Sequence, residues 1–204
     1  QQAFFEKAEK LSKKRATAGK KLAKAICESL QELDLKNAAF SIHGIGEKAD
    51  NPTAHGIDDI EFFISMNQGQ AEQPLAKVAS GGELSRISLA IQVLVAQKAT
   101  LPCMIFDEVD VGIGGATAEV VGRKLKQLAQ HCQVICVTHQ AQVAAYGNQH
   151  WYVQKQQQAN STSTEVISLE NNERIDEIAR MVGGIEMTQN TIKHAQDMLN
   201  RATA

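Results

Sequence analysis

Apolar and small residues recur at helical spacing along residues 1 to about 34, a segment without proline. This spacing predicts one long helix. The apolar stripe is thin before Leu22 and denser after it, which fits one strand of a coiled coil whose partner helix is absent. An ordinary surface helix explains the same pattern equally well, so both interpretations stay open at this point.

After about residue 38, apolar and polar residues alternate with a period of two. Residues 39–43 and 57–64 have the pattern of strands on either side of a turn around Asn51-Pro52, and together they predict a β-hairpin. A loop through Pro74 precedes a turn of small residues, and a helix follows that turn. We expect one apolar face of this helix to consist of Leu84, Ile87, Ile91, Leu94 and Val95.

Two short apolar runs, 103–106 and 134–137, flank a helical segment at residues 116–130. Strand, helix and strand in this order predict a right-handed parallel crossover. Both strands are of the kind that is buried on both faces of a parallel sheet.

The last part of the chain alternates differently. Residues 151–153 and 164–169 flank a polar tract, which predicts an antiparallel hairpin with a mobile tip. Two helices, 173–182 and 188–201, are expected to close the chain.

Composition narrows the class of protein. The 204 residues are 43% hydrophobic with a formal net charge of −2, which fits one globular domain with an appendage or two small domains. The four cysteines lack the spacing of a disulfide scaffold, so we expect a reducing cytoplasm. No apolar run approaches the roughly 20 residues of a membrane span, so no membrane partner is expected. The chain begins with Gln1 instead of Met, which suggests a piece of a longer protein.

Basic residues crowd the first segment, where a basic face could meet nucleic acid, although a solvated helical face is the favoured explanation. They are Lys7, Lys10, Lys13, Lys14, Arg15, Lys20, Lys21 and Lys24. The candidates for DNA contact are Lys13, Lys14, Arg15, Lys20 and Lys21.

Two carboxylates, Asp107 and Glu108, directly follow the first apolar run, at the edge where α/β sheets place their ligands. Neighbouring side chains on a strand point to opposite faces, so the two should have different tasks. We expect Asp107 to hold Mg²⁺, directly or through water, and Glu108 to orient or deprotonate an attacking water. The alternative is a solvated strand end that merely carries charge. It does not explain why a third carboxylate, Asp110, lies close to these two in the sequence with no basic residue beside them.

His139 ends the next strand, and in a parallel sheet it would lie at the same edge, where it could hydrogen-bond a terminal phosphate. The alternative is a zinc site of His131, Cys132, Cys136 and His139, since sulfur and imidazole are suitable zinc ligands. The strand predicted between them spreads these side chains along its length, which disfavours a tetrahedral site.

The small-residue turn at residues 79–83 leaves backbone N–H groups free to face an anion. Together with the carboxylates it predicts half of an ATPase site. The P-loop that would complete this site, Gly-x4-Gly-Lys-Ser/Thr, does not occur in the sequence. A second glycine-rich turn, 112–117, nearly reproduces the dinucleotide-binding Gly-x-Gly-x-x-Gly, but Thr117 replaces the third glycine. A nicotinamide-dependent oxidoreductase is therefore a weaker alternative function.

Residues 79–86, 106–115 and 137–140 together resemble the signature motif, the Walker B motif with its D-loop, and the switch histidine of an ABC-type ATPase head. Within that superfamily the chain is similar to the SMC-like proteins of bacterial DNA double-strand-break repair. The similarity extends through residues 55–62 and 173–184. Transport ATPases usually have other residues at Glu83 and after the Walker B glutamate, which favours the DNA-repair branch over the alternative of a transporter subunit.

The resemblance implies an α/β fold, the C-terminal lobe of an ABC/SMC-type ATPase head. Residues 37–204 would form this lobe, and residues 1–36 would form the base of a coiled-coil arm. The implied partners are a missing N-terminal lobe with the P-loop, a second head in a homodimer, and DNA. ATP and Mg²⁺ would be sandwiched between the two heads, in the cytoplasm and in association with the nucleoid.

The same resemblance assigns roles to residues. They are Glu108 and His139 for catalysis, Asp107 for the metal, and Ser80, Gly81, Gly82, Glu83 and Asp110 for the nucleotide. The signature turn would contact ATP bound to the opposing head, whereas the carboxylates would serve the nucleotide of their own head. Without the P-loop lobe, we expect the chain to be inactive alone.

Overall fold

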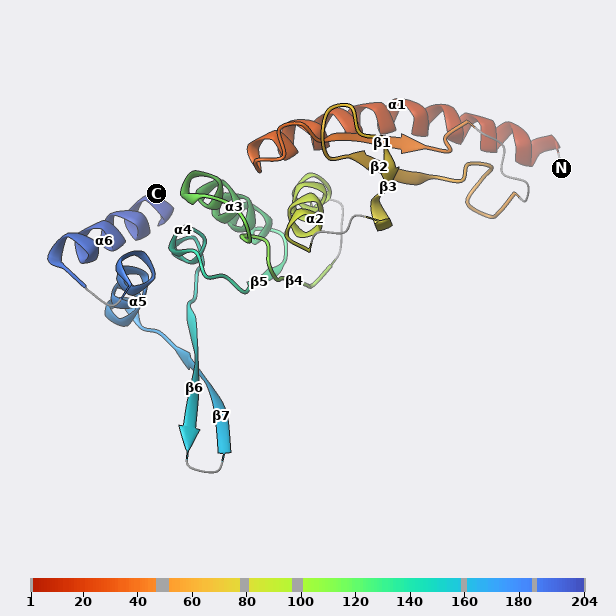
Figure 1. Cartoon of the computed structure of the whole chain (residues 1–204). Coiled ribbons are helices and arrows are strands. Elements are labelled where there is room, and N and C mark those ends of the chain that lie inside the picture. The colour runs from red at the N-terminus through yellow and green to blue at the C-terminus, as the bar shows by residue number, and fades with distance from the viewer. Residues whose placement is uncertain are drawn as a thin grey trace. The chain divides into compact units, whose positions relative to one another are not determined.

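The computed structural model describes residues 2–46, 52–77, 81–96, 101–158, 161–184 and 187–203. The chain divides into two compact units, Gln1–Gln97 and Lys98–Ala204. Figure 1 draws the first unit from red to yellow and the second from green to blue.

The first unit is built on helix α1 (Gln2–Glu32), which confirms the long helix predicted from the apolar spacing. One side of α1 packs against strand β1 (Ala39–His43). At Gly19, an added Cβ would lie only 3.1 Å from Cδ1 of Ile45. The helix therefore packs closely against the segment after β1 at this position, and a larger residue would require the Ile45 side chain to shift.

Strand β2 (Glu61–Ser65) pairs antiparallel with β1 on one side and with the short edge strand β3 (Gln73–Pro74) on the other. The predicted hairpin of the first two strands is thus confirmed, and its paired residues Phe40 and Ile64 are buried. Strand β3 was not predicted because Pro74 suggested a loop, but an edge strand tolerates proline.

The second strand begins later than predicted, at Glu61 instead of Ile57. Asp58 is drawn away from the sheet, since its carboxylate accepts hydrogen bonds from Ser12 Oγ (2.6 Å) and Arg15 Nη1 (2.8 Å) of α1. The backbone N–H of Gly46 donates to the same carboxylate. The segment before β2 is therefore anchored on the helix rather than extended in the sheet.

A short 3-10 turn, η1 (Leu75–Lys77), and helix α2 (Gly81–Val95) complete the described part of this unit. The apolar face predicted for α2 is partly wrong, because Leu84 and Leu94 are exposed. Other residues of α2, including Leu89, are fully buried, and the helix contacts α1. Since α2 carries apolar side chains around most of its surface, spacing alone did not determine the buried side.

The second unit begins with two parallel strands, β4 (Cys103–Phe106) and β5 (Gln133–Cys136), connected through helix α3 (Gly115–Leu128). The parallel pairing and the connecting helix of the predicted crossover are confirmed. The prediction that both strands are buried on both faces is wrong, because Ile105 is 71% exposed and Val137, just after β5, is 59% exposed. In the described residues these two strands form a sheet of their own, which leaves one face uncovered.

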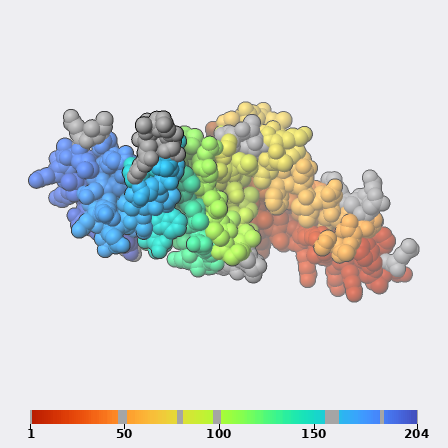
Figure 2. Space-filling model, turned by 90° about the horizontal axis from the view of Figure 1, so that it is seen from below, coloured from red at the N-terminus to blue at the C-terminus, as the bar shows by residue number. Residues whose placement is uncertain are grey.

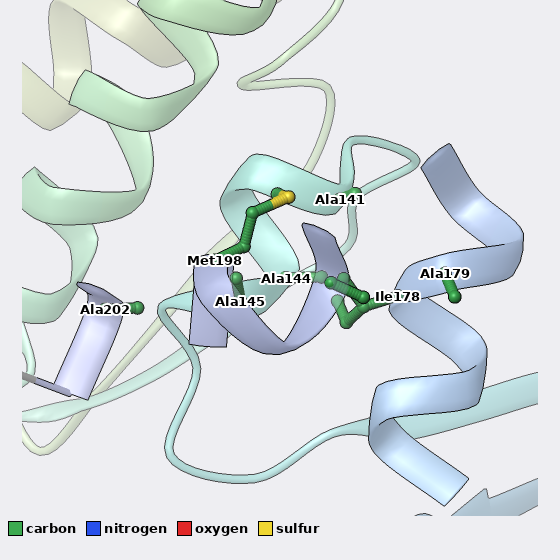
Figure 3. Close-up of a cluster of buried hydrophobic side chains, with 8 residues drawn as sticks. Ala141, Ala144, Ala145, Ile178, Ala179, Met198 and Ala202 are labelled. Carbon is green, nitrogen blue, oxygen red and sulfur yellow. The ribbon is translucent and has the colours of Figure 1, made fainter. Parts of the chain in front are cut away.

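Helices α4 (Ala141–Ala145), α5 (Asn171–Gly183) and α6 (Gln189–Thr203) pack around a cluster of buried apolar side chains, most of them alanines, shown in Figure 3. The cluster consists of Ala141, Ala144, Ala145, Ile178, Ala179, Ala195, Met198 and Ala202. The two closing helices were predicted, whereas α4 was not. Its five residues are too few to show a helical period.

Strands β6 (Trp151–Gln158) and β7 (Ser161–Ser168) form the predicted antiparallel hairpin. Most of the polar tract that was expected to be a mobile tip is strand instead. The hairpin register continues through it as far as the pair Gln158–Ser161. Serine and threonine are compatible with strand backbone, so pairing with a neighbour outweighs the missing apolar alternation.

Candidate functional site

The carboxyl ends of β4 and β5 lie side by side. Phe106 pairs with Cys136 in the register, and the N–H of Val137 donates to the carbonyl of Phe106 at 2.9 Å. The residues that follow each strand therefore reach the same edge of the sheet. This places Asp107, with Glu108 and Asp110 after it, beside the loop that carries His139.

Glu108 has a backbone conformation that is rare for its residue type. Its φ angle is +59°, in the left-handed region, although it has a Cβ atom. The N–H of Glu108 donates to Asp107 Oδ1 at 3.0 Å, and its carbonyl accepts from the N–H of Val111 at 3.2 Å. These hydrogen bonds hold a tight turn at the strand end. Strained backbone of this kind gathers at functional sites, which supports a role for this turn.

Asp107 and Glu108 are both exposed at this edge, whereas Asp110 is only 1% exposed. One oxygen of Asp110, Oδ2, accepts hydrogen bonds from the hydroxyl of Thr138 and from the N–H groups of His139 (3.1 Å) and Gln140 (3.2 Å). The buried carboxylate therefore fastens the loop after β5 to the turn after β4.

The imidazole of His139 lies partly over this junction. Its Nδ1 is 3.5 Å from Asp110 Oδ2, and its side chain is 64% exposed. Gln140 Nε2 lies 3.5 Å from the other ring nitrogen, Nε2 of His139. The histidine is thus anchored through its backbone and one ring nitrogen, while most of the ring faces solvent.

Cys136, at the end of β5, is a neutral thiol. Burial is the largest cause that raises its pKa to about 12, and the nearby carboxylates of Asp110 and Asp107 raise it further. A thiol with such a pKa is a poor nucleophile and a poor metal ligand at neutral pH.

The structure gives no geometric support to the zinc alternative. Within the described ranges, no three His, Cys, Asp or Glu side chains converge in a way that could hold a metal ion. His131 and His139 are both exposed and lie at opposite ends of β5, while Cys132 and Cys136 are half-buried along it.

The signature turn belongs to the first unit. Ser80 lies outside the described residues. Gly81 and Gly82 form the first positions of α2, where Gly82 is buried and Glu83 half-buried. Arg86, one turn farther, is 7% exposed, and burial lowers its pKa while Glu83 and Asp34 favour its charged form.

Sequence reasoning identified the strand-end carboxylates and His139 but missed Thr138, whose hydroxyl completes the attachment to Asp110. A threonine just before a strand-end histidine is too common to be singled out by pattern. No helix in the part of the chain that the structure describes has the length and apolar content needed to cross a membrane.

Comparisons with known proteins identify relatives along nearly the entire chain. DNA repair protein RecN of Vibrio cholerae is 46% identical over 198 residues, which are 97% of this chain and 36% of that protein. The RecN of Haemophilus influenzae is 45% identical over 93% of this chain and 34% of that protein. This chain therefore spans about a third of the length of the curated relatives it matches, and the resemblance to SMC-like DNA repair proteins is confirmed. No family model matches the chain.

Solved structures agree on the fold. The Smc head domain of Pyrococcus furiosus, solved with an extended coiled coil and bound to the C-terminal domain of ScpA, has a TM-score of 0.53 at 17% identity, covering 85% of this chain and 41% of that one. The Smc head of Pyrococcus yayanosii, solved with a coiled coil and joint, has a TM-score of 0.52 at 18% identity, covering 90% of this chain and 29% of that one. The fold is thus the predicted α/β fold of an ABC/SMC-type ATPase head lobe.

Proposed function

We propose, on the premise that this chain is similar to RecN along nearly its whole length, that it is the C-terminal part of an ATP-hydrolysing SMC-like protein of recombinational DNA repair. The single observation that carries the proposal is the meeting of Asp107, Glu108 and the loop of His139 at one edge of two parallel strands. The matched relatives are DNA repair proteins, which favours this function over a transporter subunit or an oxidoreductase.

At this edge each side chain has a distinct task. Asp107 would hold Mg²⁺, whose usual ligands are one or two carboxylates together with phosphate oxygens and water. Glu108 would orient and deprotonate the attacking water, and the exposed ring of His139 would donate a hydrogen bond to the terminal phosphate. Bound Mg²⁺ would offset the negative charge of the phosphates.

The signature turn would serve a second nucleotide. The N-terminus of α2, with Gly81 and Gly82, presents backbone N–H groups and the positive end of a helix dipole to an anion. Ser80 would add its hydroxyl and Glu83 its carboxylate to the contact surface. In a two-head sandwich this turn would face ATP bound to the opposing head of a homodimer.

The exposed strands support an N-terminal lobe with the P-loop as a partner. Strand β5 is paired only with β4, and β6 only with β7, among the described residues. Apolar side chains are exposed near both open edges, including Val137, Trp151 and Val153. A lobe that adds strands and covers these side chains would explain both features.

The remaining assignments extend the proposal to the whole protein. Helix α1, within residues 1–36, would be the base of the coiled-coil arm, residues 37–204 would form the lobe, and DNA would be the substrate on which the protein acts. The protein would work in the cytoplasm, associated with the nucleoid.

The proposal is tested by co-expressing this chain with a P-loop lobe from the same protein. The chain alone should show no ATP hydrolysis, and the complex should hydrolyse ATP. Glu108→Gln should block turnover while ATP-dependent pairing of heads persists, as measured by size-exclusion chromatography. Glu119→Gln on α3 is the matched control and should leave turnover unchanged, because glutamine keeps an oxygen that can accept the hydrogen bond from the Tyr146 hydroxyl. Full hydrolysis by the Glu108→Gln complex would refute the role of Glu108.

A further inference from the structure

Three observations connect the two loops of the candidate site through one side chain. Asp110 belongs to the tight turn after β4, which the hydrogen bond from Val111 N–H to the Glu108 carbonyl closes at 3.2 Å. Its carboxylate accepts three hydrogen bonds from the loop after β5, all at Oδ2. It is also almost completely buried, with 1% of its surface exposed.

We infer that Asp110 is a positioning residue, which holds residues 138–140 so that the imidazole of His139 is presented at the edge that carries Glu108. This inference rests on the proposed function and deepens it, because it assigns Asp110 a task inside its own head. Asp110 would act through His139 and the turn, without direct contact to the nucleotide.

The hydrogen-bond geometry favours this task. Two successive backbone N–H groups and one hydroxyl converge on a single oxygen, which fixes the backbone of His139 as well as the direction of its side chain. Hydrogen bonds to an ionised carboxylate are stronger than those between neutral groups. The 3.5 Å approach of His139 Nδ1 to the same oxygen restrains the ring itself.

The burial of Asp110 separates this task from nucleotide binding. Its Oδ2 is occupied by donors from within its own unit, and the side chain has almost no surface left for a phosphate or ribose. A carboxylate would also repel a phosphate. The exposed groups at this edge are instead Asp107, Glu108 and His139.

The first test uses amide hydrogen exchange of the 204-residue chain, measured by NMR. In Asp110→Ala, exchange at His139 should accelerate at least tenfold, because this N–H group loses its acceptor. Exchange at Gln140 should accelerate less, because its N–H also donates to Thr138 Oγ1 at 3.0 Å. The N–H of Val137, which donates to the Phe106 carbonyl, is the internal control and should be unchanged. Equal acceleration of all three would mean that Asp110 only supports the fold, and would overturn the inference.

Asp110→Asn keeps the test decisive if the alanine variant fails to fold. The amide oxygen of Asn can still accept the two N–H groups, so protection of His139 and Gln140 should return to within about threefold of the parent chain. An asparagine variant as unprotected as the alanine variant at these two amides would contradict the assigned contacts.

The second test uses the complex with the P-loop lobe. Asp110→Ala should lower kcat at least tenfold with the KM for ATP nearly unchanged. The double variant Asp110→Ala, His139→Ala should have the same kcat as Asp110→Ala, because both substitutions remove the same positioned imidazole. A raised KM with unchanged kcat would indicate direct nucleotide contact and overturn the inference. If the parent complex does not hydrolyse ATP, the proposed function fails while the exchange result still decides the role of Asp110.

Discussion

Single residues at the strand ends carry the candidate chemistry, and only part of their arrangement follows from sequence. Asp107, Glu108 and His139 could be predicted because each follows an apolar strand. The burial of Asp110 could not, since it depends on the register that brings the loop after β5 over the turn after β4. The backbone strain at Glu108 likewise results from that turn and has no signature in the sequence.

The strain at Glu108 leads to a stability prediction. Residues with a Cβ atom pay about 1 kcal/mol or more for a left-handed backbone, whereas glycine adopts it freely. Glu108→Gly should therefore be about 1 kcal/mol more stable than Glu108→Ala, as measured by urea unfolding of the isolated chain. The alanine variant is the matched control, because it removes the same carboxylate. Equal stability of the two variants would show that the backbone at residue 108 is not strained.

Asp58 leads to a prediction of pH dependence. Burial alone would raise its pKa, but hydrogen bonds from Ser12, Arg15 and Gly46 outweigh burial and hold the pKa below its ordinary value of 3.8. A lowered pKa in the folded state means that the ionised carboxylate stabilises the fold above about pH 3.8. This contribution is lost as the pH falls through the lower pKa of the folded state.

Asp58→Asn should accordingly lower the free energy of unfolding by about 2 kcal/mol at pH 7, because charge-assisted hydrogen bonds are lost. The difference should shrink as the pH falls below 3.8. Urea unfolding of both chains between pH 2 and 7 measures it. Asp59→Asn, the neighbouring residue, is the control. A difference that stays constant with pH would contradict the role of the ionised carboxylate.

At the scale of elements, the sequence predicted most helices and strands correctly, because long periodic segments and short apolar runs have distinct spacings. The errors have physical causes. Pairing extended the hairpin through a polar tract, α4 was too short to show a period, and Asp58 drew the start of β2 away from the sheet. The burial of β4 and β5 was overestimated because periodicity cannot reveal which face has a covering layer.

The basic residues of helix α1 differ in their exposure to solvent. Arg15 is paired with Asp58 at 2.8 Å, so Asp58 offsets the charge of this DNA-contact candidate. The lysines of α1 are exposed, and α1 forms the red surface in Figure 2. Their positions place them on the side opposite the buried residues of the helix, so they form a lysine-rich face, on which Lys24 is paired with Glu28 at 3.9 Å.

The hypothesis that this face contacts DNA phosphates has a direct test. Replacing Lys13, Lys14, Lys20 and Lys21 by glutamine should weaken DNA binding and reduce the slope of log K against log salt by up to about 4, measured by fluorescence anisotropy. The matched control replaces four exposed lysines elsewhere with the same loss of charge. They are Lys36, Lys77, Lys155 and Lys193. If both sets of substitutions weakened DNA binding equally, the loss would come from the change in net charge and not from a contact of this face.

At the scale of the whole molecule, the two units carry the residues of two different proposed nucleotide sites. The signature turn lies in the first unit, and the carboxylates with His139 lie in the second. The second unit also exposes apolar strand residues that a domain complete in itself would bury. Both features agree with a chain that spans about a third of its RecN relatives.

The exposed strand face should matter for assembly and not for the stability of the chain itself. Ile105→Ser with Val137→Ser removes two side chains that are 71% and 59% exposed, so the free energy of unfolding should change by less than about 0.5 kcal/mol for each. Copurification with the P-loop lobe should fall at least tenfold. Val182→Ser on α5, also exposed, is the control. Undiminished copurification would place the lobe contact elsewhere.

Trp151, at the start of β6, is the one tryptophan in the sequence, and it is 56% exposed on the hairpin. The protein therefore contains its own optical reporter for the hairpin face. Its indole should emit at the long wavelengths of a hydrated ring and be quenched readily by iodide. Whatever covers that face will shift the emission to the blue and shield it, so assembly can be followed in real time without any label.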